Sequence, residues 1–368
     1  MIGLAYLNYA GLAPLRLRSA LAALFPWEIA GNALLPRFVD RQQRIRDDVA
    51  TWLGVGERNL AFLTSTTSAL QAVAASIPWQ PGDVVLYPHG DFPANVLPWT
   101  GLKRFGVRAV AVSDWTVPFP ARTRLVAISS VDYSTGDERP WREVCARARA
   151  TGAWTCVDAI QSAGVRPSWS EDVDFWAAGT QKWLVSGLGL ALLVVGDRAL
   201  AGLDGPWLTY LGREDPRRPD SPPADSARRW ELGWVTPGAL VRFESSFRAL
   251  RAHGWTTVSD ELRARRDSIH ERLLDIGYPV VSSPERWSGI VTVDPAPWLA
   301  SEIVHDGYRR RIVVADRAGW IRLSAHIFTA PREIDRALDW LWRIRAGRIV
   351  PAPVPAATTP ATDSRSER

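Results

Sequence analysis

The chain has 368 residues, of which 46% are hydrophobic and 23% charged, and its formal net charge at pH 7 is +5. This composition excludes a disordered or fibrous chain, and the length is typical of two domains that share a sizeable core. No apolar run approaches the roughly 20 residues of a membrane helix, and no basic residue precedes the apolar amino-terminal stretch, so we expect a cytoplasmic protein without a secretory signal.

Short apolar runs alternate with helical patterns over the first 250 residues. The spacing of apolar positions predicts helices over 37–53, 69–77 and 140–150. Strands are expected at 60–63, 84–87, 109–112, 125–129, 155–157, 175–177 and 190–195. This alternation is typical of an α/β fold with a mostly parallel central sheet and helices on both faces.

The remaining chain predicts a long loop, a smaller domain and a tail. Residues 204–229, rich in Pro, Arg and Asp, are expected to form a functional or mobile loop. Helices are expected over 239–252, 257–276 and 331–344, and short strands at 289–293, 311–315 and 320–324. We therefore divide the chain into an amino-terminal segment (1–25), a large domain (26–250), a small carboxy-terminal α+β domain (251–348) and a disordered Pro/Ala/Thr/Ser-rich tail (349–368).

Nearly all the basic residues are arginine. Lys and Arg total 44, but only Lys103 and Lys182 are lysines. An amine can lose its proton and form a Schiff base, whereas a guanidinium stays charged, so these two side chains are the candidate amine nucleophiles. Lys103 lies in the charged segment GLKRFG and is expected on the surface. Lys182 lies between an apolar strand and a glycine-containing turn, an unusual place for a solubilising charge.

The sequence indicates neither a metal site nor a nucleic-acid site. The two cysteines, Cys145 and Cys156, lack the paired spacing of zinc ligands. The arginines are dispersed among acidic residues, and no zinc-finger or RNA-recognition signature is present. We expect no bound metal, no nucleic-acid partner and no membrane partner.

Two further features complement Lys182. Asp158 ends an apolar strand where ligands bind in parallel sheets, and a carboxylate buried there needs a positive partner such as a protonated pyridine nitrogen. Thr66 and Thr67 lie between a strand and a helix, where hydroxyls, backbone N–H groups and the helix dipole favour an anion. Singly, these threonines would be an ordinary helix cap and Asp158 a turn residue. Together with Lys182 they suggest pyridoxal phosphate held as a Schiff base.

The order of the motifs resembles that of class V aminotransferases, the family that includes cysteine desulfurases, isopenicillin-epimerase-like proteins and C–S lyases. DAIQSAG and DVDFWAAGTQKWLVSGLG carry the resemblance around Asp158 and Lys182. It extends to about residue 345 through YLNYAG, STTSAL, DFPANVLPW, SVDYSTG, RRWELGWVTPG and IRLSAHIFT. The resemblance implies a PLP-dependent enzyme of fold type I, with pyridoxal 5'-phosphate as cofactor and an amino acid as substrate.

The resemblance also implies roles for single residues around the cofactor. Lys182 would form the Schiff base, Asp158 would hold the pyridinium nitrogen, and Gln161 would hydrogen-bond the phenolic oxygen. Phe92 would stack on the ring where desulfurases have histidine, so proton exchange at that position is lost. The phosphate and its surroundings would be held by Thr66, Thr67, Thr180 and Gln181, the last of which replaces a histidine of most desulfurases.

On the substrate side, the resemblance assigns the α-carboxylate to Arg322, because a guanidinium can grip it with two hydrogen bonds. Taken singly, Arg322 would be a surface strand residue. Asn8, Ala10 and Gly11 would line the substrate pocket. The family builds its active sites from two protomers, so we expect a homodimer in which residues 233–236, including Thr236, reach the partner's cofactor.

Several reactions remain open. Desulfurases need a mobile cysteine just before the substrate-binding arginine, and the corresponding stretch 312–320 contains none. β-Elimination needs only Lys182 as base and a leaving group, so a C–S lyase acting on a cysteine conjugate is the leading hypothesis. An aminotransferase is the close alternative, and an epimerase would need a second acid that we do not identify. A scaffold without catalysis is the non-enzyme alternative, which the joint presence of Lys182, Asp158 and Arg322 disfavours.

Overall fold

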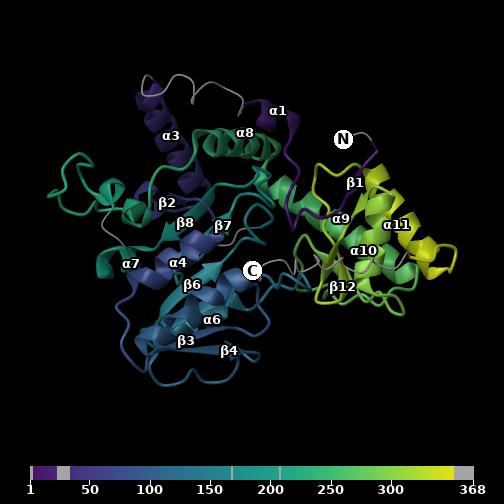
Figure 1. Cartoon of the computed structure of the whole chain (residues 1–368), viewed down its shortest axis with the longest axis horizontal. Coiled ribbons are helices and arrows are strands. Elements are labelled where there is room, and N and C mark those ends of the chain that lie inside the picture. The colour runs from purple at the N-terminus through teal and green to yellow at the C-terminus, as the bar shows by residue number, and fades with distance from the viewer. Residues whose placement is uncertain (1–2, 23–33, 167–168, 207–208, 352–368) are drawn as a thin grey trace, which may run out of the picture.

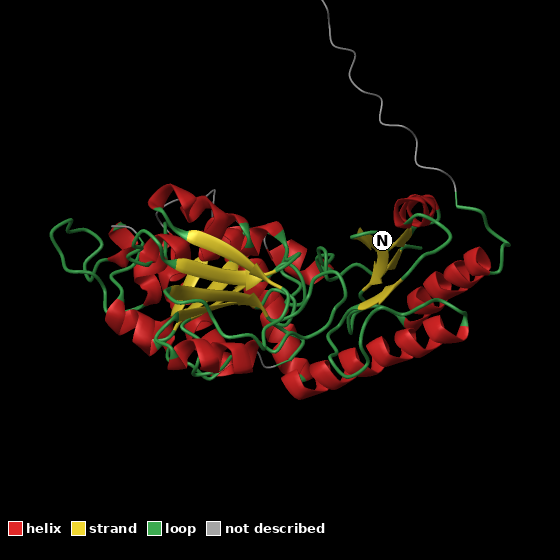
Figure 2. Ribbon diagram, turned by 90° about the horizontal axis from the view of Figure 1, so that it is seen from below, coloured by secondary structure: helices red, strands yellow, loops and turns green. Residues whose placement is uncertain are grey.

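The computed structural model describes residues 3–22, 34–166, 169–206 and 209–351, and these form two bodies (Figure 1). Figure 2 shows the large sheet of one body and the smaller sheet of the other, each with its own helices. Most of the expected tail lies outside the described residues. No helix in the described part of the chain is long and apolar enough to span a membrane.

A seven-stranded sheet forms the centre of the larger body. Its order is β2 (Leu60–Leu63), β8 (Ala191–Val195), β7 (Phe175–Gly179), β6 (Trp154–Asp158), β5 (Thr123–Ser129), β3 (Val84–Pro88) and β4 (Arg108–Val112). β8 runs antiparallel to both of its neighbours, and all other adjacent strands of this sheet are parallel. Since both faces are covered, the strands are continuous apolar runs rather than alternating ones. The predicted mostly parallel sheet is confirmed.

Helices cover both faces of this sheet and give it two cores. One core contains side chains of α3 (Leu35–Leu53), α6 (Trp141–Ala150) and α8 (Pro237–His253). The opposite core contains side chains of α4 (Thr66–Ser76) and α7 (Asp197–Gly202). Successive strand residues alternate between the cores, as Ala61 and Phe62 do, because a strand's side chains point to opposite faces.

Short elements connect these layers. They are α1 (Leu17–Ala22), α5 (Leu97–Thr100) and five 3₁₀ turns at Glu57–Asn59, Pro93–Asn95, Gly101–Phe105, Tyr210–Gly212 and Ala227–Trp230, all within the described ranges. The fourth turn lies in the expected loop 204–229, and the fifth spans the end of that loop. Trp230 is fully buried there, and the buried Glu231 forms an ion pair with Arg46 at 2.8 Å. The end of this loop is therefore anchored in the core.

The smaller body is an α+β unit with a separate core. Its antiparallel sheet has the order β11 (Ala315–Arg317), β12 (Trp320–Leu323) and β9 (Val291–Val293). Its helices are α9 (Trp255–Asp275), α10 (Ala300–Arg309) and α11 (Pro331–Arg345). The single strand expected over 311–315 is wrong, because the chain divides there into β10 (Ile312–Val313) and β11, which belong to different sheets.

The amino-terminal segment joins the two bodies. β1 (Ala5–Tyr6) pairs in parallel with β10, and Asn8 forms a bridge to Ser324. The backbone N–H of Ala10 then donates to Ser324 Oγ at 2.9 Å, and the Ala10 carbonyl accepts from Gln161 Nε2 at 3.0 Å. Ala10 therefore contacts the small domain and the large domain at once.

Candidate active site

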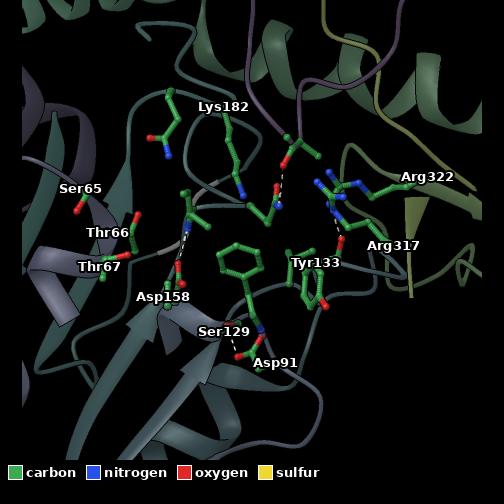
Figure 3. Close-up of a pocket in the computed structure, with 18 residues that line it drawn as sticks. Ser65, Thr66, Thr67, Asp91, Ser129, Tyr133, Asp158, Lys182, Arg317 and Arg322 are labelled. Carbon is green, nitrogen blue, oxygen red and sulfur yellow. Dashed lines mark hydrogen bonds between the residues drawn. The ribbon is translucent and has the colours of Figure 1, made fainter. Parts of the chain in front are cut away.

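A cavity of about 200 Å³ lies at the carboxyl ends of the central strands (Figure 3). Its walls come from residues that follow β2, β3, β5, β6 and β7, from the amino-terminal segment, and from the hairpin of β11 and β12. This is the edge of a parallel sheet at which ligands bind. The predicted site residues that line it are Ala10, Gly11, Thr66, Thr67, Phe92, Asp158, Gln161, Gln181, Lys182 and Arg322.

Lys182 enters this cavity from the turn after β7. Its amine lies 5.9 Å from the centroid of the Phe92 ring. Burial, followed by the positive charge of Arg322, lowers the pKa of Lys182 to about 7. Burial therefore favours the neutral amine, which is the form that acts as a nucleophile or base.

Asp158 is the last residue of β6 and is only 4% exposed. Its Oδ1 accepts a hydrogen bond from the backbone N–H of Ile160 at 3.0 Å. Among the described residues it forms no ion pair, and burial raises its pKa to about 7. A carboxylate in this state is stabilised by any cation placed beside it.

The first turn of α4 forms one wall of the cavity. Ser65 caps the helix through a reciprocal hydrogen-bonded pair with Ser68, so Thr66 and Thr67 are the first two helical residues. Their backbone N–H groups belong to the first turn, which lacks intrahelical acceptors, and the positive end of the helix dipole lies there. This geometry favours a phosphate.

Gly179, at the end of β7, packs against this wall. Its N–H donates to Thr66 Oγ1 at 2.8 Å. A Cβ at position 179 would lie 2.3 Å from Gln181 Oε1 and 2.9 Å from Thr66 Oγ1. A side chain at position 179 would therefore displace Gln181 and crowd the Thr66 hydroxyl, so glycine keeps strand end, helix start and Gln181 close together.

Two predicted cofactor residues lie outside the cavity lining. Thr180 is fully buried, and its hydroxyl donates to the Leu190 carbonyl at 3.0 Å, so it stabilises the turn that carries Lys182. Thr236 is exposed and caps α8 by accepting from the Ala239 N–H at 3.4 Å. Within one chain, neither side chain reaches the cavity.

Phe92 is 47% exposed and presents its ring to the cavity. Its edge packs against Tyr133, with centroids 5.3 Å apart and planes at 73°. The turn that carries it is fixed by Asp91, which accepts hydrogen bonds from the Phe92 N–H at 2.9 Å and from Ser129 Oγ at 2.5 Å. Burial raises the pKa of Asp91.

Arg322 is 1% exposed, so it is not the surface residue that its sequence context alone would suggest. Its Nη1 donates to the Tyr133 carbonyl at 2.6 Å and its Nη2 donates to Asn8 Oδ1 at 3.3 Å. Asn8 therefore contacts the guanidinium from outside the cavity lining. Burial, followed by the charge of Arg317, lowers the pKa of Arg322 to about 9.

Several functional-site residues were not predicted. Asp91, Ser129, Tyr133 and Arg317 line the cavity, as does the cap residue Ser65. Ser129 ends β5 and Asp91 follows β3 by three residues, so the strand-end rule that identified Asp158 could have found them. No such signal marks Tyr133 or Arg317.

The residues present fit pyridoxal phosphate. Among the described residues, the cavity combines a helix N-terminus for a phosphate, a buried carboxylate that forms no ion pair, an amine of lowered pKa and an accessible aromatic face. These are the complements of the cofactor's phosphate, its ring nitrogen, its aldehyde and its ring face.

The aminotransferase class-V family model matches residues 33–305, and the chain belongs to this family. It is 24% identical over 313 residues to the uncharacterized aminotransferase YcbU of Bacillus subtilis, covering 82% of this chain and 83% of the relative. It is 25% identical over 345 residues to isopenicillin N epimerase of Amycolatopsis lactamdurans, covering 80% and 83%. A cysteine desulfurase of Pectobacterium atrosepticum is 24% identical over 346 residues, with 85% and 84% covered.

Solved structures share the fold. The cystine C–S lyase C-DES, solved with its product cysteine persulfide, has a TM-score of 0.85 at 18% identity, covering 93% of this chain and 98% of that chain. Cysteine desulfurase of Thermococcus onnurineus has a TM-score of 0.82 at 17% identity, covering 94% and 95%. The predicted family, fold type I and pyridoxal phosphate are thereby confirmed, and the protein is a PLP-dependent enzyme.

Proposed function

We propose that this enzyme is a C–S lyase that cleaves a cysteine conjugate by β-elimination. The observation that carries the proposal is the combination of a buried amine, Lys182, with a substrate-side hairpin that bears Arg317 and Arg322 but no cysteine. β-Elimination requires a base and a leaving group, and no second nucleophile. Elimination breaks the Cβ–S bond and releases the thiol and 2-aminoacrylate, which one water molecule then hydrolyses to pyruvate and ammonia.

Pyridoxal phosphate, when bound, supplies an electron sink that makes the Cα–H of an attached amino acid acidic. Lys182, with its pKa lowered to about 7, takes that proton as general base. Asp158 keeps the ring nitrogen protonated, since its buried carboxylate gains a positive partner there. Arg322 binds the α-carboxylate through its forked guanidinium.

The other predicted residues position these groups. Thr66 and Thr67 hold the phosphate at the start of α4, with Gln181 beside them. Gln161 Oε1 accepts from Trp183 Nε1 at 3.1 Å and its Nε2 donates to the Ala10 carbonyl at 3.0 Å, which fixes the amide and leaves a second Nε2 N–H that would donate to the phenolic oxygen. Phe92 stacks on the ring.

The cysteines argue against a persulfide-forming desulfurase. Cys145 and Cys156 are both 0% exposed, and burial raises the pKa of each thiol. A nucleophilic cysteine is a thiolate in an accessible position, which neither residue satisfies. Their free, buried state also suits a reducing compartment, in keeping with the cytoplasmic location that we propose.

Product analysis tests the reaction. We expect the holoenzyme to release pyruvate and an equimolar amount of thiol from S-substituted cysteines when no keto acid is added as an amino-group acceptor. Lys182→Ala serves as the inactive control. Amino transfer that depends on an added keto acid would instead establish the aminotransferase alternative, which the likeness to the Bacillus subtilis relative supports.

We also propose a homodimer in which residues 233–236 approach the partner's cofactor. Leu232, just before this segment, and Trp234, within it, are 47% and 40% exposed. Leu188, whose carbonyl accepts a hydrogen bond from Arg242 of α8, is 64% exposed. Large apolar side chains that gather on a surface are typical of an interface. Sedimentation velocity is expected to give a dimer, and a monomer with full activity would refute the arrangement.

A further inference from the structure

Arg317 and Arg322 share the substrate end of the cavity. In the hairpin of β11 and β12, Arg322 pairs directly with Ala315, two residues before Arg317. Directly paired residues point to the same face of a sheet, as do residues two apart on one strand. Both guanidinium groups therefore leave the same face of the hairpin, and Figure 3 shows them side by side at the cavity.

The hairpin holds Arg317 in a defined place. Its connection is the two-residue turn Ala318–Gly319, with φ of 54° and 83°. Positive φ at both central residues is the geometry of a type I′ turn, which matches the twist of the strands and fixes their register. Arg317 is therefore presented by a short, ordered element in the stretch where desulfurases are expected to carry a mobile cysteine.

Arg317 has no carboxylate partner among the described residues. Its Nη1 donates to the carbonyl of the adjacent Asp316 at 2.6 Å, and no ion pair is formed. Its side chain lines the cavity and forms no other hydrogen bond with the described residues, so further guanidinium N–H groups stay available to a ligand.

The hairpin end of the cavity carries two guanidinium groups and, among the described residues, no lining carboxylate. The whole lining contains Lys182, Arg317 and Arg322 as cations and Asp91 and Asp158 as carboxylates. Both carboxylates lie on the large-domain side, at the ends of the strands. The α-carboxylate of an amino acid would neutralise Arg322 alone. Two adjacent guanidinium groups repel each other, and a second anion between them and the solvent would relieve that repulsion.

We propose that Arg317 binds a second carboxylate on the substrate side chain, so that the preferred substrate is a cysteine conjugate whose S-substituent ends in a carboxylate. This inference rests on the proposed function, whose substrate class it narrows. Arg322 binds the α-carboxylate, which all amino acids share, and Arg317 binds the carboxylate of the S-substituent, which leaves with the thiol. Arg317 is thus a specificity-determining residue for the same site.

Calorimetry with unreactive ligands tests the binding. Glutarate has two carboxylates, and its monoamide, glutaramate, has one, with nearly the same shape. We expect the holoenzyme to bind glutarate about tenfold more tightly, because a charge-assisted hydrogen bond replaces a neutral one. Arg317→Gln should remove this preference and leave glutaramate binding unchanged, which also shows that the variant is folded. Arg309→Gln, an exposed change at the end of α10, should keep the preference.

Two results would overturn the assignment. One is an equal affinity of the wild-type holoenzyme for both ligands, or a preference that survives in Arg317→Gln. The other is an equal loss of affinity for both ligands in Arg317→Gln, since Arg317 would then share the first carboxylate with Arg322.

Turnover separates this inference from the proposed function. S-(2-carboxyethyl)cysteine and S-(2-carbamoylethyl)cysteine differ in the same single group. If neither compound releases pyruvate but the holoenzyme still binds glutarate more tightly than glutaramate, β-elimination is refuted and the role of Arg317 stands. If both compounds release pyruvate equally well and the holoenzyme binds glutarate and glutaramate equally, the lyase stands and the role of Arg317 is refuted.

Discussion

Replacing Asp158 by Asn is expected to stabilise the cofactor-free protein while impairing the enzyme. The carboxylate is 4% exposed, accepts a hydrogen bond from the Ile160 N–H and lacks an ion-pair partner in the described part of the chain. Burial therefore raises its pKa from 3.8 to about 7. Asn keeps an acceptor for the Ile160 N–H and removes the buried charge.

The sign and size of the effect follow from linkage. An acid whose pKa is raised by folding destabilises the native state as pH rises from its unfolded to its folded pKa, and the full cost applies above the folded pKa. The change from 3.8 to about 7 corresponds to about 4 kcal/mol at most. The advantage of Asp158→Asn over wild type should therefore be small at about pH 4, grow toward about pH 7 and stay constant above it.

Urea denaturation of the cofactor-free proteins measures this difference. Asp335→Asn is the control, because that side chain is 62% exposed in a surface ion pair that contributes about 0–1 kcal/mol. Adding pyridoxal phosphate should stabilise wild type more than Asp158→Asn, since only the carboxylate gains a charged partner. A variant that is less stable than wild type at about pH 8, or a difference independent of pH, would refute the reasoning.

Three further substitutions test the remaining roles. Lys182→Ala should abolish both activity and the visible absorption band of the bound cofactor, whereas the exposed Lys103→Ala should change neither; a band that survives in Lys182→Ala contradicts the site. The double change Cys145→Ala with Cys156→Ala should keep most activity, and a stable protein-bound persulfide in the wild type during turnover would restore the desulfurase reading. Arg322→Lys should raise KM, because one ammonium cannot form the forked contact and the substrate loses about 1–3 kcal/mol of binding free energy. An unchanged KM contradicts the carboxylate role.

Sequence patterns predicted the large sheet because its strands are buried on both faces and appear as continuous apolar runs. The same reasoning placed Asp158 at a strand end, and in the structure Asp158 lines the cavity. The orientation of side chains within a tight turn follows no period, so Thr180 could not be distinguished from its neighbours Gln181 and Lys182. Its hydroxyl is used inside the turn instead.

The substrate end was harder to predict than the cofactor end. Arg317 reaches the cavity through the register of a two-residue hairpin, and a shift of one residue would turn its side chain to the other face. Tyr133 contributes its backbone carbonyl to Arg322, a contact that its residue type does not specify. In a chain with so many arginines, composition alone does not distinguish a buried arginine from exposed ones.

The pairing of β1 with β10 determines the order in which the cavity can be assembled during synthesis. Ala5 and Ile312 are partners although roughly 300 residues separate them, so this contact has a very long sequence separation. At ribosomal rates the amino-terminal strand waits on the order of tens of seconds for its partner. The cofactor end, built from residues 65–182, is complete in sequence well before Arg317 and Arg322 emerge. A nascent chain thus contains all the residues of its own cavity that we propose to bind pyridoxal phosphate before it contains Arg317 and Arg322, which we propose to bind the substrate.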